Sequence, residues 1–239
     1  MIKLGILGAN GKMGREVAHL AQSGFSDKAQ LVAEVSENQP LHPLLQMDAV
    51  IDFSAPAGML ALAELAIAAP ASQSLPAFIV GSTGWKIDER RRLEELSQRA
   101  PVLVSSNFSI GVLALTEVLR MAAPLLEKLG YTPVISEIHH KHKKDSPSGT
   151  ALSLQRAISP AGPGNVQTHS IRAGEIIGDH EVTFYSTADH IKIGHFAQDR
   201  SIFARGALEA ALWLAGRRSN NPSAGKLIGM DVFFKERIQ

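Results

Sequence analysis

Apolar residues in the first hundred positions fall into short uninterrupted runs, separated by stretches with helical periodicity. The runs cover residues 2–7, 30–35, 49–53, 77–80 and 102–104, and apolar runs of this length between turn residues are typical of buried strands. Residues 56–69, rich in Ala and Leu, and the charged residues 88–99 each predict a helix. Strands that alternate with helices predict βαβ units and a parallel sheet.

The pattern changes near residue 110, which indicates a second domain. Residues 111–129 predict a long helix, residues 133–138 a strand, and a further helix begins at Thr150. Residues 181–185 and 190–195 alternate as strands of an antiparallel or mixed sheet with one open face. Residues 200–217 predict a helix and residues 231–234 a late strand or turn, with loops over 159–165 and 219–226.

Charge and cysteine content narrow the function classes. The chain has 24 Lys and Arg against 23 Asp and Glu, a net charge of +1, which argues against a general nucleic-acid or membrane-surface binder. It has no Cys, which excludes disulfides, a thiol nucleophile and Cys-ligated metals. Its apolar stretches are too short for a membrane span or a signal peptide. We therefore expect a soluble, cytoplasmic protein.

Three glycines, Gly8, Gly11 and Gly14, stand between the first predicted strand and a helix. Glycines there let the backbone approach a pyrophosphate, and the helix N-terminus offers free N–H groups and a positive dipole end. A tight turn without a ligand is the alternative, but the alternating α/β pattern favours dinucleotide binding. The carboxylate that would bind the adenosine ribose is expected after the second strand, where Glu37 is the candidate and a solvated loop charge the alternative.

Small polar residues follow the fourth and fifth predicted strands, at residues 81–84 and 105–108. In a parallel sheet both places lie at the carboxyl edge, where ligands of such sheets bind. Hydroxyl and amide groups at this edge can hydrogen-bond the nicotinamide ribose or carboxamide. Polar turns without a ligand are the alternative.

A basic segment precedes the helix that begins at Thr150. Three His and three Lys stand within residues 139–144, and Ser148, Gly149 and Thr150 follow. A helix N-terminus with hydroxyl groups binds anions, and His or Lys beside it can hold carboxylates and deliver a proton. The alternatives are a solvated loop and a zinc site; Lys neighbours repel a cation, so no metal is expected. The segment predicts a site for an anionic substrate with acid catalysis.

The chain resembles the 4-hydroxy-tetrahydrodipicolinate reductase family, also called dihydrodipicolinate reductase, of bacterial lysine and diaminopimelate biosynthesis. The motif that carries the resemblance is Glu137-x-His139-His140-x-x-Lys143-x-Asp145-Ser146-Pro147-Ser148-Gly149-Thr150-Ala151. Residues 8–14, 52–54, 81–84, 107–109, 172–178 and 200–207 also match, so the resemblance covers essentially the whole chain.

The resemblance implies an α/β fold with two domains. A Rossmann-type parallel-sheet domain would comprise residues 1–109 and 201–239 and bind NADH or NADPH. An α+β mixed-sheet domain over residues 110–200 would bind the substrate and build a homotetramer. The implied partner is a small-molecule dicarboxylate, with neither nucleic acid nor membrane.

The family's site residues carry over onto matching positions. The resemblance implies His139 as proton donor or acceptor and Lys143 as proton donor. It places His140, Gly149 and Thr150 at the substrate carboxylates, and Ser148 joins them as part of the helix start. The family's acidic ribose position falls on or beside Ser36, in a segment over 36–48 too short for the usual crossover helix. The residues expected at the cofactor are Gly8, Ala9, Asn10, Gly11, Lys12, Met13, Ser36, Glu37, Phe53, Gly81, Ser82, Thr83, Ser105, Ser106, Asn107 and Phe108.

The implied reaction is NAD(P)H-dependent reduction of (2S,4S)-4-hydroxy-2,3,4,5-tetrahydrodipicolinate to tetrahydrodipicolinate with loss of water. One alternative is another Rossmann-type reductase of amino-acid metabolism, which would lack the His-His-x-x-Lys segment. The other is a nucleotide-sensing binding protein without turnover, against which the presence of His139, Lys143 and Thr150 argues.

Overall fold

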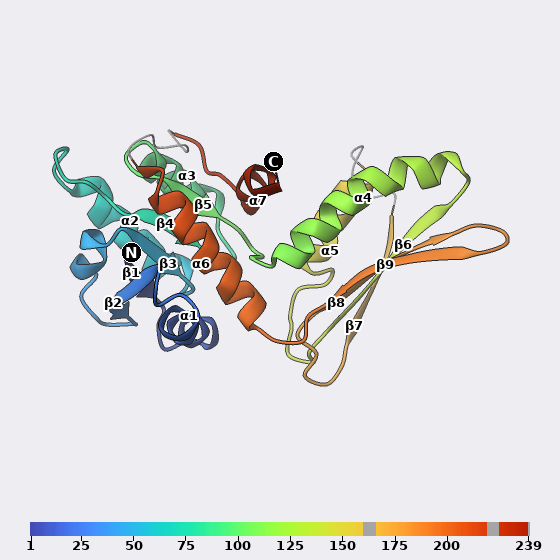
Figure 1. Cartoon of the computed structure of the whole chain (residues 1–239), viewed down its shortest axis with the longest axis horizontal. Coiled ribbons are helices and arrows are strands. Elements are labelled where there is room, and N and C mark those ends of the chain that lie inside the picture. Colours follow the sequence, from blue (N-terminus) through green and yellow to red (C-terminus); the bar gives the residue numbers. More distant parts are fainter. Residues whose placement is uncertain (160–165, 219–224, 239) are drawn as a thin grey trace. The chain divides into compact units, whose positions relative to one another are not determined.

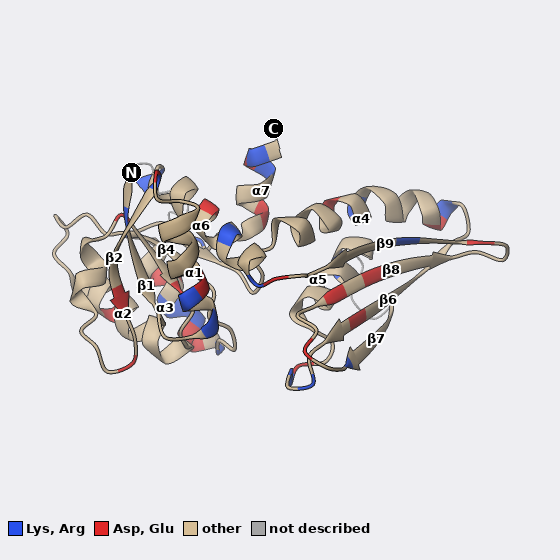
Figure 2. Ribbon diagram, turned by 60° about the horizontal axis from the view of Figure 1, so that its bottom comes forward, with Lys and Arg blue, Asp and Glu red and all other residues tan. Residues whose placement is uncertain are grey.

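The chain forms two compact units, one of residues 1–108 and 201–239 and one of residues 109–200. The computed structural model describes residues 1–159, 166–218 and 225–238 (Figure 1), so most of the two loops expected over 159–165 and 219–226 lies outside the described residues. Acidic and basic residues are interspersed along both units (Figure 2), in keeping with the near-zero net charge.

Five parallel strands form the sheet of the first unit, in the order β2-β1-β3-β4-β5. They are β1 (Ile2–Leu7), β2 (Ala29–Val35), β3 (Ala49–Asp52), β4 (Ala77–Val80) and β5 (Val102–Val104). Every residue of β3 and β4 is buried, which explains why these segments are almost purely apolar. The predicted parallel α/β sheet is confirmed.

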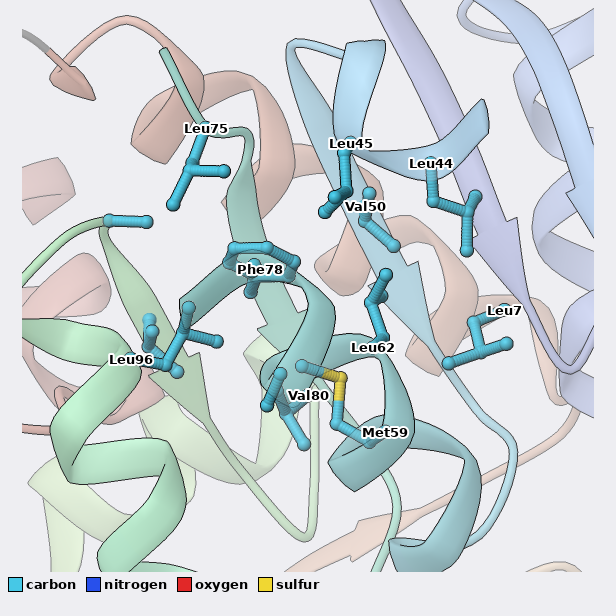
Figure 3. Close-up of a cluster of buried hydrophobic side chains, with 14 of the residues drawn as sticks. Leu7, Leu44, Leu45, Val50, Met59, Leu62, Leu75, Phe78, Val80 and Leu96 are labelled. Atoms are coloured by element: carbon cyan, nitrogen blue, oxygen red, sulfur yellow. The ribbon is translucent and has the colours of Figure 1, made fainter. Parts of the chain in front are cut away.

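Helices cover both faces of this sheet. On one face α1 (Lys12–Ser23) contacts α6 (Ser201–Ala215), which in turn contacts β3 and β4. On the other face α2 (Pro56–Ala68) and α3 (Ile87–Ser97) pack together over the strands. Figure 3 shows the apolar core beneath α2 and α3, in which these side chains point toward one another: Leu7, Val50, Met59, Leu62, Phe78, Val80 and Leu96.

The connection from β2 to β3 is short. It contains a single 3-10 turn, η1 (His42–Gln46), whose Leu44 and Leu45 are buried in the core. A Cβ on Gly5 of β1 would lie 2.7 Å from a methyl group of Leu44, so the glycine makes room for the turn. The turn therefore takes the place of a crossover helix.

The second unit is a four-stranded mixed sheet covered on one face by two helices. Its strands are ordered β7-β6-β8-β9: β6 (Thr132–His139) runs parallel to β7 (Gln167–Arg172) and antiparallel to β8 (Asp179–Tyr185), which pairs antiparallel with β9 (His190–Phe196). The helices α4 (Ile110–Lys128) and α5 (Gly149–Ile158) contact each other, and their apolar faces bury the sheet residues Ile135, Val182 and Phe184. The predicted mixed sheet is confirmed.

Residues 231–234 are helical, so the expected late strand or turn is wrong. They belong to α7 (Met230–Ile238), in which Met230, Phe233 and Phe234 are buried. The Phe233 ring meets the Trp213 ring edge-on at 5.6 Å. The three buried residues have helical spacing, and their packing overrides the strand preference of the Val-Phe-Phe run. None of the helices in the described ranges combines the length and apolar character that a membrane span requires.

Candidate active site

The glycine loop after β1 brings its backbone against neighbouring backbone. Gly8 has φ +87°, and a Cβ on it would lie 2.7 Å from the backbone N of Ser54. A Cβ on Gly14 would collide with the carbonyl oxygen of Gly8. α1 begins at this loop without a side-chain cap, so its first N–H groups are available to an anion. The loop is therefore a cradle that side chains would fill, and it fits a pyrophosphate.

Ser36 and Glu37 follow β2 beside this loop. The Ser36 hydroxyl accepts a hydrogen bond from the backbone N of Asn10 at 3.1 Å, and the backbone N of Gly8 donates to the carbonyl of Val35 at 2.8 Å. The end of β2 thus holds the glycine loop in place. Glu37 is exposed in the turn that follows, as is Lys12 at the start of α1. Both charges are accessible where the adenosine end of a dinucleotide would lie.

A buried carboxylate organises the next part of the sheet edge. Asp52, the last residue of β3, accepts from the backbone N of Ser54 at 2.9 Å, from the Ser54 hydroxyl at 2.5 Å and from the Ser82 hydroxyl at 2.5 Å. Burial raises the pKa of Asp52, and these hydrogen bonds offset only part of that effect. Asp52 lies in one of the matching sequence motifs, but the sequence gave it no role. In the structure Asp52 fixes the loop after β4, and this loop contains Ser82, which was expected at the cofactor.

Aromatic residues occupy the remainder of this edge. The rings of Phe53 and Phe108 meet edge-on with 5.6 Å between centroids, and a Cβ on Gly81 would collide with the Phe53 ring. After β5 the Ser105 hydroxyl donates to the carbonyl of Asn107 at 2.6 Å and turns the chain. Thr83 and Ser106 are exposed. The structure thus brings the residues expected at the cofactor together at the carboxyl edge of one sheet.

The basic segment connects β6 to α5 in the second unit. His139 ends β6 and is buried, whereas His140 and Lys143 are partly exposed. Nζ of Lys143 lies 2.9 Å from a carboxylate oxygen of Asp145. Ser148 is the N-cap of α5 and accepts from the backbone N of Ala151 at 3.2 Å. A helix start, a lysine and two histidines thus stand within one segment.

A buried ion-pair network lies beneath this segment. The carboxylate of Glu137 accepts from Nη2 of Arg172 at 2.8 Å and contacts Nδ1 of His139. Burial alone would raise the pKa of Glu137, but Arg172, Ser170 and His139 together hold it below its usual value. Burial lowers the pKa of His139, and Lys143 and Arg172 lower it further, against the opposing effect of Glu137.

Two more histidines extend the network across the sheet. His180 of β8 is paired in register with Glu137 and, on its other side, with His195 of β9. Burial lowers the pKa of His180 to about 3, so it is neutral at physiological pH. Its Nε2 lies 3.1 Å from the hydroxyl of Ser148, and Nε2 of His195 lies 3.3 Å from the hydroxyl of Ser109, the N-cap of α4. Burial also lowers the pKa of His195.

Sequence reasoning did not assign functions to Glu137, His180 or Arg172. The alternation of a strand was the available signal for Glu137, because positions 135, 137 and 139 of β6 share one face. His180 and Arg172 reach that face through strand pairing, which a single sequence does not specify.

The same network resembles a metal-ligand set in part. Among the described residues, Glu137, His139 and His180 offer ligand atoms that lie within 4.8 Å of one another. One Glu137 oxygen is already bound to the Arg172 guanidinium, however, and a cation at that distance opposes a metal ion. The geometry therefore favours a hydrogen-bonded network over a metal site, and the expectation of no metal stays a prediction.

Comparisons with known proteins agree across the whole chain. The family model described as "Dihydrodipicolinate reductase, N-terminus" matches residues 2–108, and that described as "Dihydrodipicolinate reductase, C-terminus" matches residues 111–231. A 4-hydroxy-tetrahydrodipicolinate reductase of Caulobacter vibrioides is 34% identical, covering 90% of this chain and 93% of its own. One of Zymomonas mobilis is 32% identical, covering 96% of this chain and 98% of its own.

Solved structures show the same fold. A dipicolinate-bound dihydrodipicolinate reductase from Paenisporosarcina sp. TG-14 has a TM-score of 0.72 at 20% identity, covering 96% of this chain and 97% of its own. A probable dehydrogenase from Thermotoga maritima has a TM-score of 0.59 at 11% identity. The expected fold class, a Rossmann-type sheet with a second mixed sheet, is confirmed.

Proposed function

Because the chain belongs to the dihydrodipicolinate reductase family, we propose that it reduces 4-hydroxy-tetrahydrodipicolinate to tetrahydrodipicolinate. The (2S,4S)-hydroxy compound loses water to give a conjugated imine, which takes up a hydride from NADH or NADPH and a proton. The observation that carries the proposal is the basic segment after β6, with a buried Glu137–His139 pair beneath it and the start of α5 at its end.

The first unit holds the cofactor in this proposal. Bound reduced nicotinamide supplies the hydride. The glycine loop and the uncapped start of α1 would bind the pyrophosphate, and the polar and aromatic residues after β3, β4 and β5 would surround the nicotinamide end. Their shared position at one edge of the sheet supports this assignment.

The start of α5 anchors the dicarboxylate. Its N-terminus carries the positive end of the helix dipole, and the Thr150 hydroxyl stands on its first turn. The buried Ser148 hydroxyl instead caps the helix and contacts His180. His140 and Lys143 add donors from the preceding loop. Two ring carboxylates need fixed donors on both sides, and this segment supplies them from a helix start and a loop.

Proton transfer falls to Lys143 and His139. Negative charge that develops on the substrate during hydride addition must be quenched by a nearby acid. Lys143 carries its ammonium group on a flexible side chain, and Asp145 holds this group at 2.9 Å. A substrate carboxylate would replace Asp145 as its partner, which brings the ammonium group to the reacting ring.

Replacing Lys143 tests the proposal. NADH or NADPH oxidation is followed with substrate generated in situ from pyruvate and aspartate semialdehyde. Lys143→Ala should lower kcat by about 10²–10⁴-fold with a smaller change in KM. Lys144→Ala, at the exposed neighbouring lysine, is the matched control and should leave kcat unchanged. Failure of the wild type to oxidise either cofactor would refute the reaction; a loss of kcat below about threefold in Lys143→Ala would remove Lys143 as donor.

A homotetramer in the cytoplasm completes the proposal. The sheet face opposite α4 and α5 exposes large apolar residues, among them Ile171, Tyr185 and Phe196, each about half accessible. An exposed apolar face of this kind marks a protein interface. Light scattering should give four times the 25.6 kDa subunit mass, and Phe196→Lys should lower it. A monomer mass for the wild type at micromolar concentration would refute the assembly.

A further inference from the structure

Glu137 is a fully buried carboxylate whose two oxygens have different neighbours. Oε1 accepts from Nη2 of Arg172 at 2.8 Å and from the backbone N of Ser148 at 3.3 Å. Oε2 contacts Nδ1 of His139. The same Nη2 also donates to the carbonyl of Asp145 at 2.5 Å, and Nη1 of Arg172 donates to the carbonyl of Ile171 at 2.8 Å, so both terminal nitrogens of the guanidinium are held. The carboxylate therefore cannot rotate without leaving two donors unpaired.

This arrangement determines where neutral His139 carries its proton. A carboxylate only accepts hydrogen bonds, so the ring nitrogen that faces it must be the donor. That nitrogen is Nδ1, which is buried against Oε2 of Glu137 and has no other hydrogen-bond partner among the described residues. Nε2 is then the ring atom with a free lone pair. A Cβ on Gly178 would lie 3.0 Å from Nε2, so the glycine at this position keeps space beside that atom.

Charged and titratable groups face His139 from four segments. Glu137 lies on the same strand, Arg172 on β7, Lys143 on the basic segment and His180 on β8, whose ring meets that of His139 edge-on at 5.0 Å. The two cations disfavour a protonated His139, and His180 is neutral. Glu137 is the single group of this set that favours the protonated ring.

We propose that Glu137 is a positioning residue that holds His139 with its proton on Nδ1 and so makes Nε2 the atom that exchanges a proton with the substrate. The inference rests on the proposed function, in which His139 is a proton donor or acceptor. It assigns a role to a residue that does not itself contact substrate.

Glu137→Gln tests the inference because Arg172 and Ser148 dictate how the new amide must lie. Both are donors, so the amide oxygen must stay with them and the NH₂ group must face Nδ1 of His139. The neutral ring is then forced to carry its proton on Nε2. The variant thus reverses the tautomer while it preserves side-chain shape.

The tautomer is read by ¹⁵N NMR of histidine-labelled protein near neutral pH, with His139→Gln used to assign the resonances. Wild type should show a protonated Nδ1 and Glu137→Gln a protonated Nε2. We expect kcat of Glu137→Gln to fall at least about 100-fold, with KM changed less than about threefold. Glu181→Gln is the matched control, because Glu181 lies on the other face of β8 and pairs with Lys192. It should change neither the tautomer nor kcat.

Wild-type His139 with its proton on Nε2 would overturn the inference, and this measurement stands even if Glu137→Gln does not fold. A reversed tautomer with kcat within about threefold of wild type would also overturn it, because Nε2 would then not exchange the proton. An inactive wild type would refute the proposed function instead, and the NMR result would still decide the role of Glu137 in holding the ring.

Discussion

Asp52 allows a direct test of how the cofactor edge is held together, because it is a buried carboxylate with neutral partners. It is 1% exposed, and its three hydrogen bonds come from Ser54 and Ser82. Asp52→Asn keeps the shape and removes the charge. In the variant the amide oxygen can accept both bonds from Ser54, and the NH₂ group donates to the Ser82 hydroxyl. A hydrogen bond to a charged group contributes about 1.5–3 kcal/mol and a neutral one about 0.5–1.5 kcal/mol, so the three bonds lose about 3–4.5 kcal/mol in total.

The loss of these bonds competes with the removal of a desolvated charge. Burial raises the pKa of Asp52 despite the three bonds, which means that desolvation of the carboxylate outweighs them. We therefore expect Asp52→Asn to be at least as stable as wild type near pH 8. When the pKa of a carboxyl group is higher in the folded than in the unfolded state, its contribution to stability is fully present below the unfolded-state pKa. This contribution is lost as the pH rises through the folded-state pKa. Wild type should accordingly gain stability relative to the variant as the pH falls, by at most about 1.4 kcal/mol per pH unit.

Tryptophan fluorescence during urea unfolding measures this difference in unfolding free energy, because it reports on the structural unit that contains Asp52. Both tryptophans, Trp85 and Trp213, belong to the unit that contains Asp52, and the Trp85 indole donates to the carbonyl of Ser82 at 2.7 Å. Unfolding free energies are compared between about pH 5 and pH 8. Asp88→Asn, which removes an exposed carboxylate from the same unit, is the control for the loss of a charge alone. A variant that is less stable by about 1.5–3 kcal/mol near pH 8, with wild type losing stability as pH falls, would refute the reasoning.

Three further changes probe other parts of the site. Thr150→Val keeps the side-chain shape at the start of α5 and removes the hydroxyl group. KM should therefore rise by the equivalent of about 1.5–3 kcal/mol, with a smaller loss of kcat. An unchanged KM in steady-state assays would mean that Thr150 does not bind the substrate. Exposed Glu37 favours NADH and exposed Lys12 favours NADPH, so kcat/KM for the two cofactors should differ by less than about 100-fold. Glu37→Gln should shift the ratio of the two kcat/KM values toward NADPH. An unchanged ratio would mean that Glu37 does not contact the ribose. Gly178→Ala places a methyl group 3.0 Å from Nε2 of His139. The variant should lose about 1–3 kcal/mol of unfolding free energy, measured by circular dichroism. A variant with the stability and kcat of the wild type would show that the His139 ring has room to move.

The parallel sheet of the first unit was predictable because the signal for each strand lies within its own residues. A strand buried on both faces must be apolar along its length, and β3 and β4 show this in sequence. α7 was not predictable in the same way. Its Val-Phe-Phe run has a strand-like composition, whereas the helix buries Met230, Phe233 and Phe234 and packs Phe233 against Trp213.

In the candidate site, too, the residues that lie close together in sequence could be predicted and those brought together by strand pairing could not. His139, His140 and Lys143 stand close together in sequence, so their types alone indicated an anion site. Arg172 and His180 reach the same place only through the register of β6 with β7 and β8. Contacts between distant segments depend on which strands pair, and a single sequence does not show that pairing. The chemistry of the segment was therefore visible in sequence, and its supporting network was not.

That network explains how a buried carboxylate can stand beside the proposed site for a doubly negative substrate. Glu137 accepts from the backbone N of Ser148, the residue that caps α5, so an unneutralised charge there would oppose an anion at the helix start. Arg172 removes this conflict, because its guanidinium binds Glu137 at 2.8 Å and leaves the pair without net charge. The carboxylate can then orient His139 without repelling the substrate, while neutral His180 holds the Ser148 hydroxyl and adds no charge of its own. In the proposed mechanism, orientation of the proton-transfer group and binding of the anion thus depend on the same buried ion pair.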